Sequence, residues 1–166
     1  MDLKGKVALI TGGTGGIGRA AAVAFARRGA AVVVTGRREA EGNETVKLVE
    51  REGARGLFVR ADTAVEADVA RSVQETVRAF GGLHYAFNNA GVEGLAGVPT
   101  TDQTIENYRH VFDINVLGVL LSMKHEIPAI VKSGGGAIVN NASIGGTIGM
   151  PGFPVYIASK HAVIGL

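Results

Sequence analysis

The stretch Val7-Ala-Leu-Ile-Thr-Gly-Gly-Thr-Gly-Gly-Ile-Gly18 decides the fold of this 166-residue chain. An apolar run of strand length ends in a cluster of glycines, and a helical pattern follows at 17–28. Glycines at such a strand-to-helix turn let the backbone approach a pyrophosphate and aim the helix N-terminus at its negative charge. The stretch therefore predicts a dinucleotide-binding turn, and the alternative is a glycine turn with only a structural role.

The glycines of this turn fit two spacings. Gly13, Gly15 and Gly18 match Gly-x-Gly-x-x-Gly, whereas Gly12, Gly16 and Gly18 match Gly-x-x-x-Gly-x-Gly. Spacing alone leaves the choice open, because both patterns place backbone beside phosphate. On either reading, the residues predicted to contact the cofactor here are Gly12, Thr14, Gly15, Gly16, Ile17 and Gly18.

Strand-like and helix-like segments alternate along the whole chain. Short apolar runs predict strands at 7–11, 31–35, 57–60, 85–87 and 137–140. Helical patterns predict helices at 17–28, about 39–52, 65–80, about 104–132 and from 155 onward. Strands that are apolar on both faces and alternate with helices predict an α/β fold, with a doubly wound parallel sheet between two helix layers. We expect one domain over 1–166, with its ligand beyond the carboxyl ends of the strands.

The composition excludes several kinds of site. A hydrophobic share of 46%, a charged share of 19% and 25 glycines suit a globular α/β domain with many tight turns. The absence of cysteine excludes disulfides, and the four histidines show no close metal-ligand pairing, so we expect no metal. The net charge of +2 comes from scattered residues, which argues against a nucleic-acid partner. Without an apolar run of about 20 residues or a signal peptide, we expect a cytoplasmic protein and no membrane partner.

The end of the second predicted strand bears on the choice of cofactor. Arg37 and Arg38 stand about 20 residues past the glycines, where an acidic residue would bind the ribose 2′-hydroxyl of NAD. Two guanidinium groups match a 2′-phosphate instead, which favours NADP, with NAD still possible. The alternative is that both arginines are solvated residues at the start of the next helix.

Tyr156 and Lys160 stand one helical turn apart near the end of the chain, and Ser143 precedes them by thirteen residues. Side chains four positions apart share a helix face, so the phenol and the ammonium point to the same space. A neighbouring cation favours the phenolate, which brings the phenol closer to exchanging a proton at neutral pH. The pair therefore predicts a proton-transfer site.

Five motifs in one order carry a family resemblance: the glycine turn, Asn88-Asn89-Ala90-Gly91, Asn115, Ser143 and Tyr156-Ile-Ala-Ser-Lys160. With them the chain resembles the single-domain oxidoreductase branch of the short-chain dehydrogenases/reductases. The resemblance implies a Rossmann-type domain with sheet order 3-2-1-4-5-6-7. It also implies hydride transfer between NAD(P) and a small-molecule carbonyl or secondary alcohol.

The resemblance assigns roles to the catalytic residues. Tyr156 would be the acid/base, Lys160 would favour its phenolate and bind the nicotinamide ribose, and Ser143 would hydrogen-bond the substrate oxygen. These roles agree with the chemistry, since an oxygen that gains negative charge needs a proton donor and a second donor to hold it. Asn115 would hold a water behind the lysine from a kinked helix at 113–116. The alternative for Asn115 is a polar residue on an exposed helix face.

Further cofactor contacts are implied beyond the third and fourth strands. Asp62 would contact the adenine ring, with Thr63 after it. Asp62 also precedes a helix with capping chemistry, and both roles are compatible. The remaining residues implied beside the cofactor are Asn89, Ala90 and Gly91, together with Tyr156 and Lys160.

Between Ser143 and Tyr156, the two prolines of 150–155 predict a rigid loop at the mouth of the site. Thr147, Ile148 and Phe153 would line the substrate pocket with a mainly apolar wall. A charged sugar phosphate would call for more cations. The loop leaves the identity of the substrate open.

Family members run on for roughly a third of their length beyond Leu166. We therefore expect an incomplete chain, truncated after the fifth strand and the start of the next helix, without the C-terminal strands and the substrate lid. The alternative is a naturally short chain. In either case the fifth strand would be an exposed edge.

The helices at 104–132 and from 155 onward form the usual dimer face in the family, so we expect a homodimer or homotetramer of the complete protein. The apolar residues on this face are Leu117, Val119, Leu120 and Leu121. They fit a partner surface and equally fit ordinary core packing.

The leading function hypothesis is an NADP-preferring carbonyl reductase or alcohol dehydrogenase. The second is a dinucleotide-binding fragment or inactive chain without turnover. A methyltransferase-like domain that binds S-adenosylmethionine at the glycine turn is the third, and it leaves Ser143, Tyr156 and Lys160 without a role.

Overall fold

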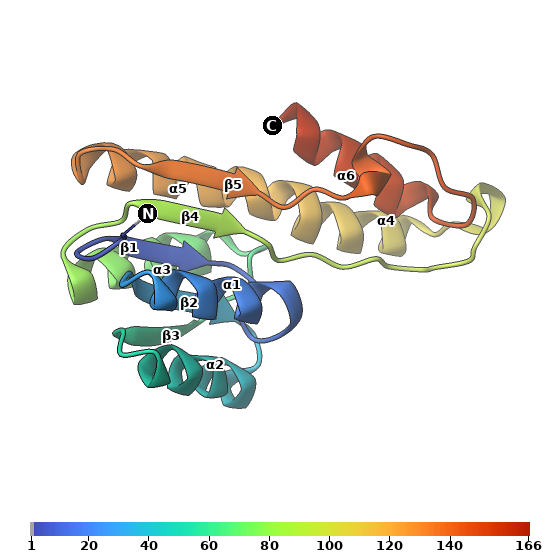
Figure 1. Ribbon diagram of the computed structural model, residues 1–166. Helices are drawn as coiled ribbons and strands as arrows, with labels where there is room; N and C mark the ends of the chain where they lie inside the picture. The colour runs from blue at the N-terminus through green and yellow to red at the C-terminus, as the bar shows by residue number, and fades with distance from the viewer. Residues whose placement is uncertain (1) are drawn as a thin grey trace.

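The computed structural model describes residues 2–166 and contains one sheet of five parallel strands (Figure 1). The strand order is β3-β2-β1-β4-β5, which matches the first five positions of the expected order. Both halves of the sheet start from β1, which pairs with β2 on one side and β4 on the other. The strands are β1 (Val7–Ile10), β2 (Ala31–Gly36), β3 (Gly56–Arg60), β4 (Tyr85–Asn88) and β5 (Ala137–Asn140).

Helices cover both faces of the sheet, so the predicted three-layer α/β architecture is confirmed. On one face α1 and α2 pack together, and on the other α3 packs against α5 (Figure 1). The predicted helix and strand positions hold to within two residues at each end. The helices are α1 (Gly16–Arg27), α2 (Glu39–Arg51), α3 (Glu66–Phe80), α4 (Ile105–Phe112), α5 (Gly118–Lys132) and α6 (Pro154–Gly165).

The core has two parts, one on each side of the sheet. Ile10, Val32 and Val34 pack with Ala22 of α1 and Val49 of α2. On the opposite face, the core comprises Leu9, Val33, Val59, Val73, Leu83, Ala86 and Ile130. All four residues of β1 are buried, as expected for a central parallel strand whose two faces are both covered.

The helix expected at about 104–132 is three segments rather than one. Thr104 caps α4 by accepting a hydrogen bond from the Asn107 N–H, and a π-helical turn at Asp113–Leu117 separates α4 from α5. A π turn adds a residue to one turn of the helix and often lies at a functional site. This local departure is the predicted irregularity around Asn115.

The apolar residues of this helix divide between core and surface. Val119 and Leu121 are buried, whereas Leu117 and Leu120 are 37% and 49% exposed. Core packing thus accounts for two of the four residues that also fit a partner surface.

The stretch Ile105–Lys132 is also the one described helix long and apolar enough to cross a membrane by length and composition. Its most apolar window is 44% buried within the molecule, and α5 packs against α3 and β4. Core helices of soluble proteins meet the same length and composition criteria.

Two strands, β3 and β5, form the edges of the sheet. Val139 of β5 is 58% exposed, as predicted for an edge strand at this position. Two short 3₁₀ helices, Thr100–Asp102 and Ile144–Gly146, were not expected from the sequence pattern, because three residues are too few to show a helical period.

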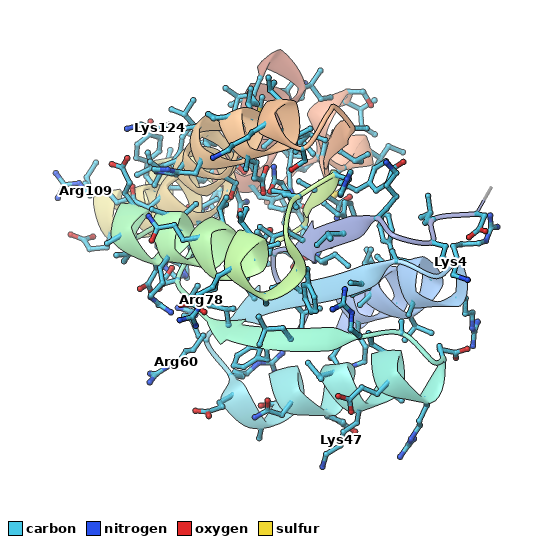
Figure 2. The ribbon with its side chains drawn as sticks, turned by 90° about the vertical axis from the view of Figure 1, so that its left-hand side faces the viewer. Lys4, Lys47, Arg60, Arg78, Arg109 and Lys124 are labelled. Carbon is cyan, nitrogen blue, oxygen red and sulfur yellow. The ribbon has the colours of Figure 1, made fainter. Side chains whose placement is uncertain are left out.

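The six basic side chains labelled in Figure 2 extend outward from separate parts of the chain.

Candidate active site

A cleft of about 390 Å³ lies beyond the carboxyl ends of the first four strands. The predicted cofactor residues that line it are Gly12, Thr14, Gly15, Arg37, Arg38, Asp62, Thr63, Asn89, Ala90 and Gly91. Gly36, Ala61, Val92 and Ile114 complete the wall. Gly16, Ile17, Gly18, Tyr156 and Lys160 do not line this cleft, although all five were predicted to contact the cofactor.

The geometry of the glycine turn distinguishes the two spacings that the sequence left open. Gly12 and Gly16 have φ of +65° and +50°, which side chains rarely adopt. A Cβ on Gly18 would lie 2.4 Å from the Gly12 carbonyl oxygen, so only glycine lets α1 approach the turn this closely. Gly15, by contrast, would meet only the Arg38 guanidinium at 3.5 Å. A Cβ on Gly13 would also clash, at 2.6 Å from Val34 Cβ, so Gly15 is the one glycine of the two spacings without a strict requirement. Every glycine of the Gly-x-x-x-Gly-x-Gly spacing is therefore restricted, whereas the other spacing includes Gly15.

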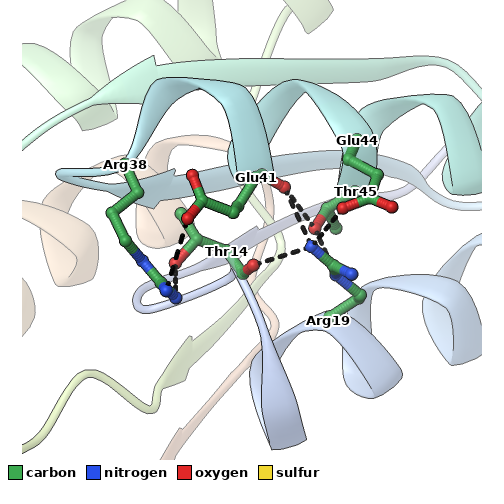
Figure 3. Close-up of polar contacts among 6 residues, drawn as sticks. All are labelled: Thr14, Arg19, Arg38, Glu41, Glu44 and Thr45. Atoms are coloured by element: carbon green, nitrogen blue, oxygen red, sulfur yellow. Dashed lines mark hydrogen bonds and ion pairs between the residues drawn. The ribbon is translucent and has the colours of Figure 1, made fainter.

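Arg19 connects the glycine turn to α2 through hydrogen bonds (Figure 3). This residue was not singled out in the sequence analysis. Its guanidinium donates to the Thr14 carbonyl oxygen at 2.9 Å, to the Glu41 carbonyl oxygen at 3.2 Å and to Thr45 Oγ1 at 3.0 Å. An ion pair with Glu44 at 3.0 Å completes the set. Arg19 looks like an ordinary polar residue of an amphipathic helix, because its partners are 5 to 26 residues away and no local pattern shows them.

Arg37 and Arg38 both border the cleft and both remain largely exposed, at 61% and 62% of the side chain. Arg37 Nη1 lies 3.7 Å from the Asp62 carboxylate. Arg38 donates to Thr14 Oγ1 at 3.1 Å and pairs with Glu41 at 3.4 Å (Figure 3). Exposed ion pairs of this kind contribute little to stability, so both guanidinium groups can exchange their partners for an anionic ligand.

Asp62 does not cap α3, whose first residue follows Val65. Its carboxylate accepts the Ala64 N–H at 3.0 Å, which closes a local turn before the helix. Asp68 then accepts the Asp62 N–H at 2.9 Å, and that backbone hydrogen bond, together with Arg71, lowers the pKa of Asp68. The capping interpretation is therefore wrong in its detail, and Asp62 still borders the cleft.

Asn115 is fully buried in the π turn, so the interpretation as an exposed polar residue is wrong. Its side-chain amide accepts the Val92 N–H at 2.8 Å and donates to the Val92 carbonyl oxygen at 2.9 Å. It also donates to Ser159 Oγ at 3.0 Å, and Ser159 Oγ donates to the Tyr156 carbonyl oxygen at 2.7 Å. Asn115 therefore joins the segment after β4 to α6. Ser159 is a linking residue that the sequence analysis did not single out.

Lys160 is 5% exposed, and its Nζ donates to the Asn141 carbonyl oxygen at 2.9 Å. Burial disfavours the charged ammonium and lowers the pKa of Lys160. Nζ lies 5.7 Å from the centre of the Tyr156 ring, as expected for side chains one helical turn apart. A Cβ on Gly91 would lie 3.2 Å from Asn115 Oδ1 and 3.5 Å from Lys160 Nζ. Since Gly91 also lines the cleft, Lys160 and Asn115 lie immediately behind the cleft wall.

Ser143 comes just before the short helix Ile144–Gly146 and accepts the Gly145 N–H at 3.1 Å. A Cβ on Gly145 would lie 3.5 Å from Ser143 Oγ and 3.6 Å from the Tyr156 ring. Ile157 Cδ1 would be nearer still, at 2.6 Å, so the side chains of Ser143, Tyr156 and Ile157 converge on Gly145. The exposed apolar side chains nearest in sequence are Ile144, Ile148 and Met150.

Asparagines at the ends of β4 and β5 connect the cleft with Lys160 of α6. Asn89 donates from its side chain to the Thr11 and Gly12 carbonyl oxygens and accepts the Asn141 side-chain amide at 3.1 Å. Asn141 in turn holds Lys160 through its backbone oxygen. The sequence shows an Asn-Asn dipeptide at the end of each strand, which was a usable signal for this contact.

Comparison with known proteins agrees with this geometry. The sequence profile of the short chain dehydrogenase family matches residues 6–166. Cyclohexanol dehydrogenase of Acinetobacter sp. (strain SE19) is 43% identical over 161 residues, which are 97% of this chain and 64% of that protein. The 2,5-dichloro-2,5-cyclohexadiene-1,4-diol dehydrogenase of Sphingobium indicum (strain DSM 16412) is 42% identical over 166 residues, 99% of this chain and 65% of that protein.

Among solved structures, NAD⁺-bound xylitol dehydrogenase superimposes with a TM-score of 0.96 at 32% sequence identity. The match covers 99% of this chain and 63% of that chain. This chain thus spans somewhat less than two thirds of the length of the relatives that it matches.

Proposed function

This chain belongs to the short-chain dehydrogenase family, and from that membership and its site we propose that it transfers a hydride between a nicotinamide dinucleotide and a secondary alcohol or its ketone. The observation that carries the proposal is the convergence of Lys160, Asn115 and Gly91 directly behind the wall of the cleft. A single dinucleotide that fills the cleft would meet the glycine turn at one end and Lys160 at the other.

The chain fits a dinucleotide in both shape and chemistry. Gly12, Gly15 and Gly91 leave the cleft wall without side chains where phosphate and ribose would lie. The N-terminus of α1 points its free N–H groups at the same turn. The nicotinamide supplies the hydride, and the chain's own residues supply binding, orientation and proton transfer.

In this proposal Tyr156 exchanges a proton with the substrate oxygen while Ser143 donates a hydrogen bond to that oxygen. Two donors at one oxygen stabilise the charge that develops when hydride arrives at or leaves the adjacent carbon. Lys160 favours the phenolate of Tyr156 and binds the nicotinamide ribose. Its hydrogen bond to the Asn141 carbonyl and its burial hold the ammonium in one place.

Asn115 positions these groups instead of reacting. Its side chain spans from Val92, at the cleft wall, to Ser159, which lies next to Lys160 in α6. The π turn supports this role, because the wider turn places a polar amide in the protein interior. The three hydrogen bonds of the amide are to Val92 and Ser159, and Asn115 is 0% exposed.

For the cofactor we propose a preference for NADP over NAD. The two residues directly after β2 are Arg37 and Arg38, which line the cleft, and neither is acidic. A 2′-phosphate could replace the weak ion pairs with Asp62 and Glu41, since charge-assisted hydrogen bonds to phosphate are stronger.

For the substrate we propose an apolar cyclic alcohol or ketone. The two relatives with the names given above act on ring alcohols by those names. The loop beyond Ser143 supports this class, because Ile144, Ile148 and Met150 expose apolar surface and no cation. An apolar ring would bury this surface, whereas a phosphorylated substrate would leave its charge without a partner.

Turnover of cyclohexanol with NADP and of cyclohexanone with NADPH tests the proposal in the protein and in Tyr156→Phe. We expect Tyr156→Phe to lower kcat by about 10²-fold or more, because it deletes only the hydroxyl that exchanges the proton. Tyr108→Phe is the matched control, since Tyr108 is exposed on α4 and stacks on Phe112. Equal turnover in Tyr156→Phe would overturn the catalytic assignment, and dinucleotide binding without any turnover would favour the binding-only alternative.

The cofactor preference has its own test in Arg37→Asp. We expect the ratio of the NADH to the NADPH dissociation constant to fall by about tenfold or more, because an acid repels the 2′-phosphate and accepts the 2′-hydroxyl. Arg51→Asp, at the far end of α2, controls for the change in net charge. An unchanged ratio in Arg37→Asp would remove Arg37 from the argument.

A further inference from the structure

Glu126 is a buried acid that the proposed reaction does not use. It lies on α5 with 1% of its surface exposed, and ionisable side chains are almost never buried so completely without a partner of opposite charge. Its neighbours include no cation: Asn88 is its one side-chain hydrogen-bond partner among residues 2–166. A polar group in such a place is costly, so its contacts indicate what it does.

One oxygen of Glu126 holds the end of β4. Asn88 Nδ2 donates to Glu126 Oε2 at 3.0 Å and, with its other hydrogen, to Asn140 Oδ1 at 3.0 Å. Asn88 and Asn140 face each other in the register of β4 and β5. Glu126, Asn88 and Asn140 are therefore joined by hydrogen bonds. The next residue of each strand end, Asn89 and Asn141, forms a second hydrogen-bonded pair nearer the cleft.

Glu126 also lines a small cavity bordered by α3 and α5. Glu126 Oε1 has no hydrogen-bond partner in the described protein and is fully buried. The cavity has a volume of about 10 Å³, which is room for one water, and the polar side chains of its wall are Thr11, Thr35, Thr63, Ser72, Ser122 and Glu126. Leu9, Ala61, Val69 and Val73 supply most of the wall surface, and the unpartnered Glu126 oxygen and the nearby hydroxyl groups offer hydrogen-bond partners to one water.

Thr11 connects this cavity with the cofactor cleft. Its Oγ1 accepts the N–H groups of Asn89 at 3.0 Å and Ala90 at 3.1 Å, so its own hydrogen is left for another acceptor. Thr11 lines the Glu126 cavity, and both residues that it holds line the cleft. Glu126 thus approaches the same short segment by two routes, through its hydrogen bond with Asn88 and through the cavity that it shares with Thr11.

We propose that Glu126 is a positioning residue of the dinucleotide site: its neutral carboxylic acid holds residues 88–90 from beneath, through the Asn88 amide and through one water shared with Thr11. This inference rests on the proposed dinucleotide site. Asn89 and Ala90 line the cleft and Asn88 directly precedes them, so a shift of this backbone would displace the bound dinucleotide.

The electrostatics of the site agree with a neutral acid. Burial raises the pKa of Glu126 to about 7, and the hydrogen bond from Asn88 opposes this only in part. The elements packed around the carboxyl are β1, β2, β4, β5 and α3, and the residues that they present to it are apolar, hydroxyl or amide side chains. The ionisable groups nearest along α3 and along α5 itself are Glu66, Asp68, Lys124 and His125, and each has a partner near the surface.

Amide NMR spectra as a function of pH test the proposal in the chain without dinucleotide. The signals to follow are the Asn88 side-chain amide and the backbone amides of Asn89 and Ala90. We expect all three to shift together with a midpoint near pH 7 in the wild type. Glu126→Gln keeps the shape and one acceptor but cannot ionise, so its three signals should not shift with that midpoint. Glu50→Gln, at an exposed position on α2, is the matched control and should behave as the wild type.

Dinucleotide affinity supplies the functional readout. Between about pH 6 and pH 8.5 we expect the dissociation constant of the wild type to rise by about fivefold or more, because a buried carboxylate draws water towards the segment. The dissociation constant of Glu126→Gln should stay level. If Glu126→Gln does not fold, the infrared band of a protonated carboxylic acid in the wild type at about pH 6 replaces it, since ordinary carboxyl groups are ionised there.

The outcomes are distinct. Absence of the common titration in the wild type, or its persistence in Glu126→Gln, would overturn the role of Glu126. A level dissociation constant in the wild type would also overturn it. Absence of dinucleotide binding at every pH, with the amide titration present, would instead contradict the proposed function.

Discussion

Different kinds of polar interaction hold the side chains at the two ends of the cleft. At the adenine end, the charged groups Arg37, Arg38 and Asp62 are held by ion pairs at 3.4 to 3.7 Å and remain open to water. At the nicotinamide end, Asn115 and Lys160 are buried, and short hydrogen bonds of 2.8 to 3.0 Å hold them. Exposed pairs are exchangeable and contribute little to stability, whereas buried polar networks are costly to break. In the proposed function, the exposed end would select the cofactor and the buried end would fix the geometry of the reaction.

The largest expected effect concerns stability against pH at the buried end. Glu126 has a pKa of about 7 in the folded protein against 4.5 as its ordinary value, so the folded state binds more protons between these pH values. Stability is highest below about pH 4.5 as far as this group is concerned, and falls by about 3 kcal/mol as pH rises through 7. Urea unfolding of the wild type and Glu126→Gln at several pH values measures the difference. Parallel pH profiles of the two proteins would contradict the expectation.

Asn115→Ala comes next in size. Removal of the amide leaves the Val92 N–H and Ser159 Oγ without their buried partner, and we expect a loss of about 2 kcal/mol. Urea unfolding checks this, with Asn43→Ala on the exposed face of α2 as the control. A loss of stability no greater than that of the control would contradict the view that the hydrogen bonds of Asn115 stabilise the buried end of the cleft.

A smaller loss of stability is expected for Arg19→Met, because Arg19 lies at a partly exposed contact between the glycine turn and α2. Methionine keeps much of the aliphatic stem and loses the four hydrogen-bonding contacts of the guanidinium, so we expect a loss of about 1 kcal/mol. Thermal unfolding compares it with Arg51→Met. A loss as large as that of Asn115→Ala would blur the difference between the two ends of the cleft.

The smallest effect is expected for Arg37→Gln at the adenine end. Its ion pair with Asp62 is long and exposed, so the free energy of unfolding should change by no more than about 0.5 kcal/mol. The dissociation constant for NADPH should nevertheless rise relative to that for NADH. Measurement of both quantities in one variant sharpens the comparison most, since a large loss of stability would place Arg37 with the buried groups.

Most of the fold could be predicted from the sequence because the relevant signals are local. Apolar runs and helical periods located all five strands and the principal helices, and the Gly-rich break before Ala137 marked the start of β5. The helix at 104–132 was predicted as one element because the apolar pattern continues through the π turn. An extra residue in one turn leaves no sign in a pattern read over many residues.

The candidate site was predictable only where a motif contains it. The spacing of Tyr-x-x-x-Lys, four positions apart, is fixed by helix geometry, so Tyr156 and Lys160 lie on one face as expected. Arg19 and Ser159 were not predicted as site residues, since each hydrogen-bonds to partners that lie elsewhere in the chain. Asp62 was assigned a capping role that Val65 excludes, because the turn after β3 is longer than the pattern indicates.

The sequence by itself determined the alternation of strands and helices, the glycine turn and the spacing of the catalytic pair, since each depends on residues within about two turns of chain. Only the tertiary structure decided which polar groups meet. Asn88 hydrogen-bonds Glu126, 38 residues away, and Thr11 hydrogen-bonds Asn89, 78 residues away. Lys160 hydrogen-bonds Asn141, directly after β5. The physical reason is that parallel strands bring their carboxyl ends to one edge whatever their separation in the chain. A hydrogen bond made there depends on packing, which no local pattern contains.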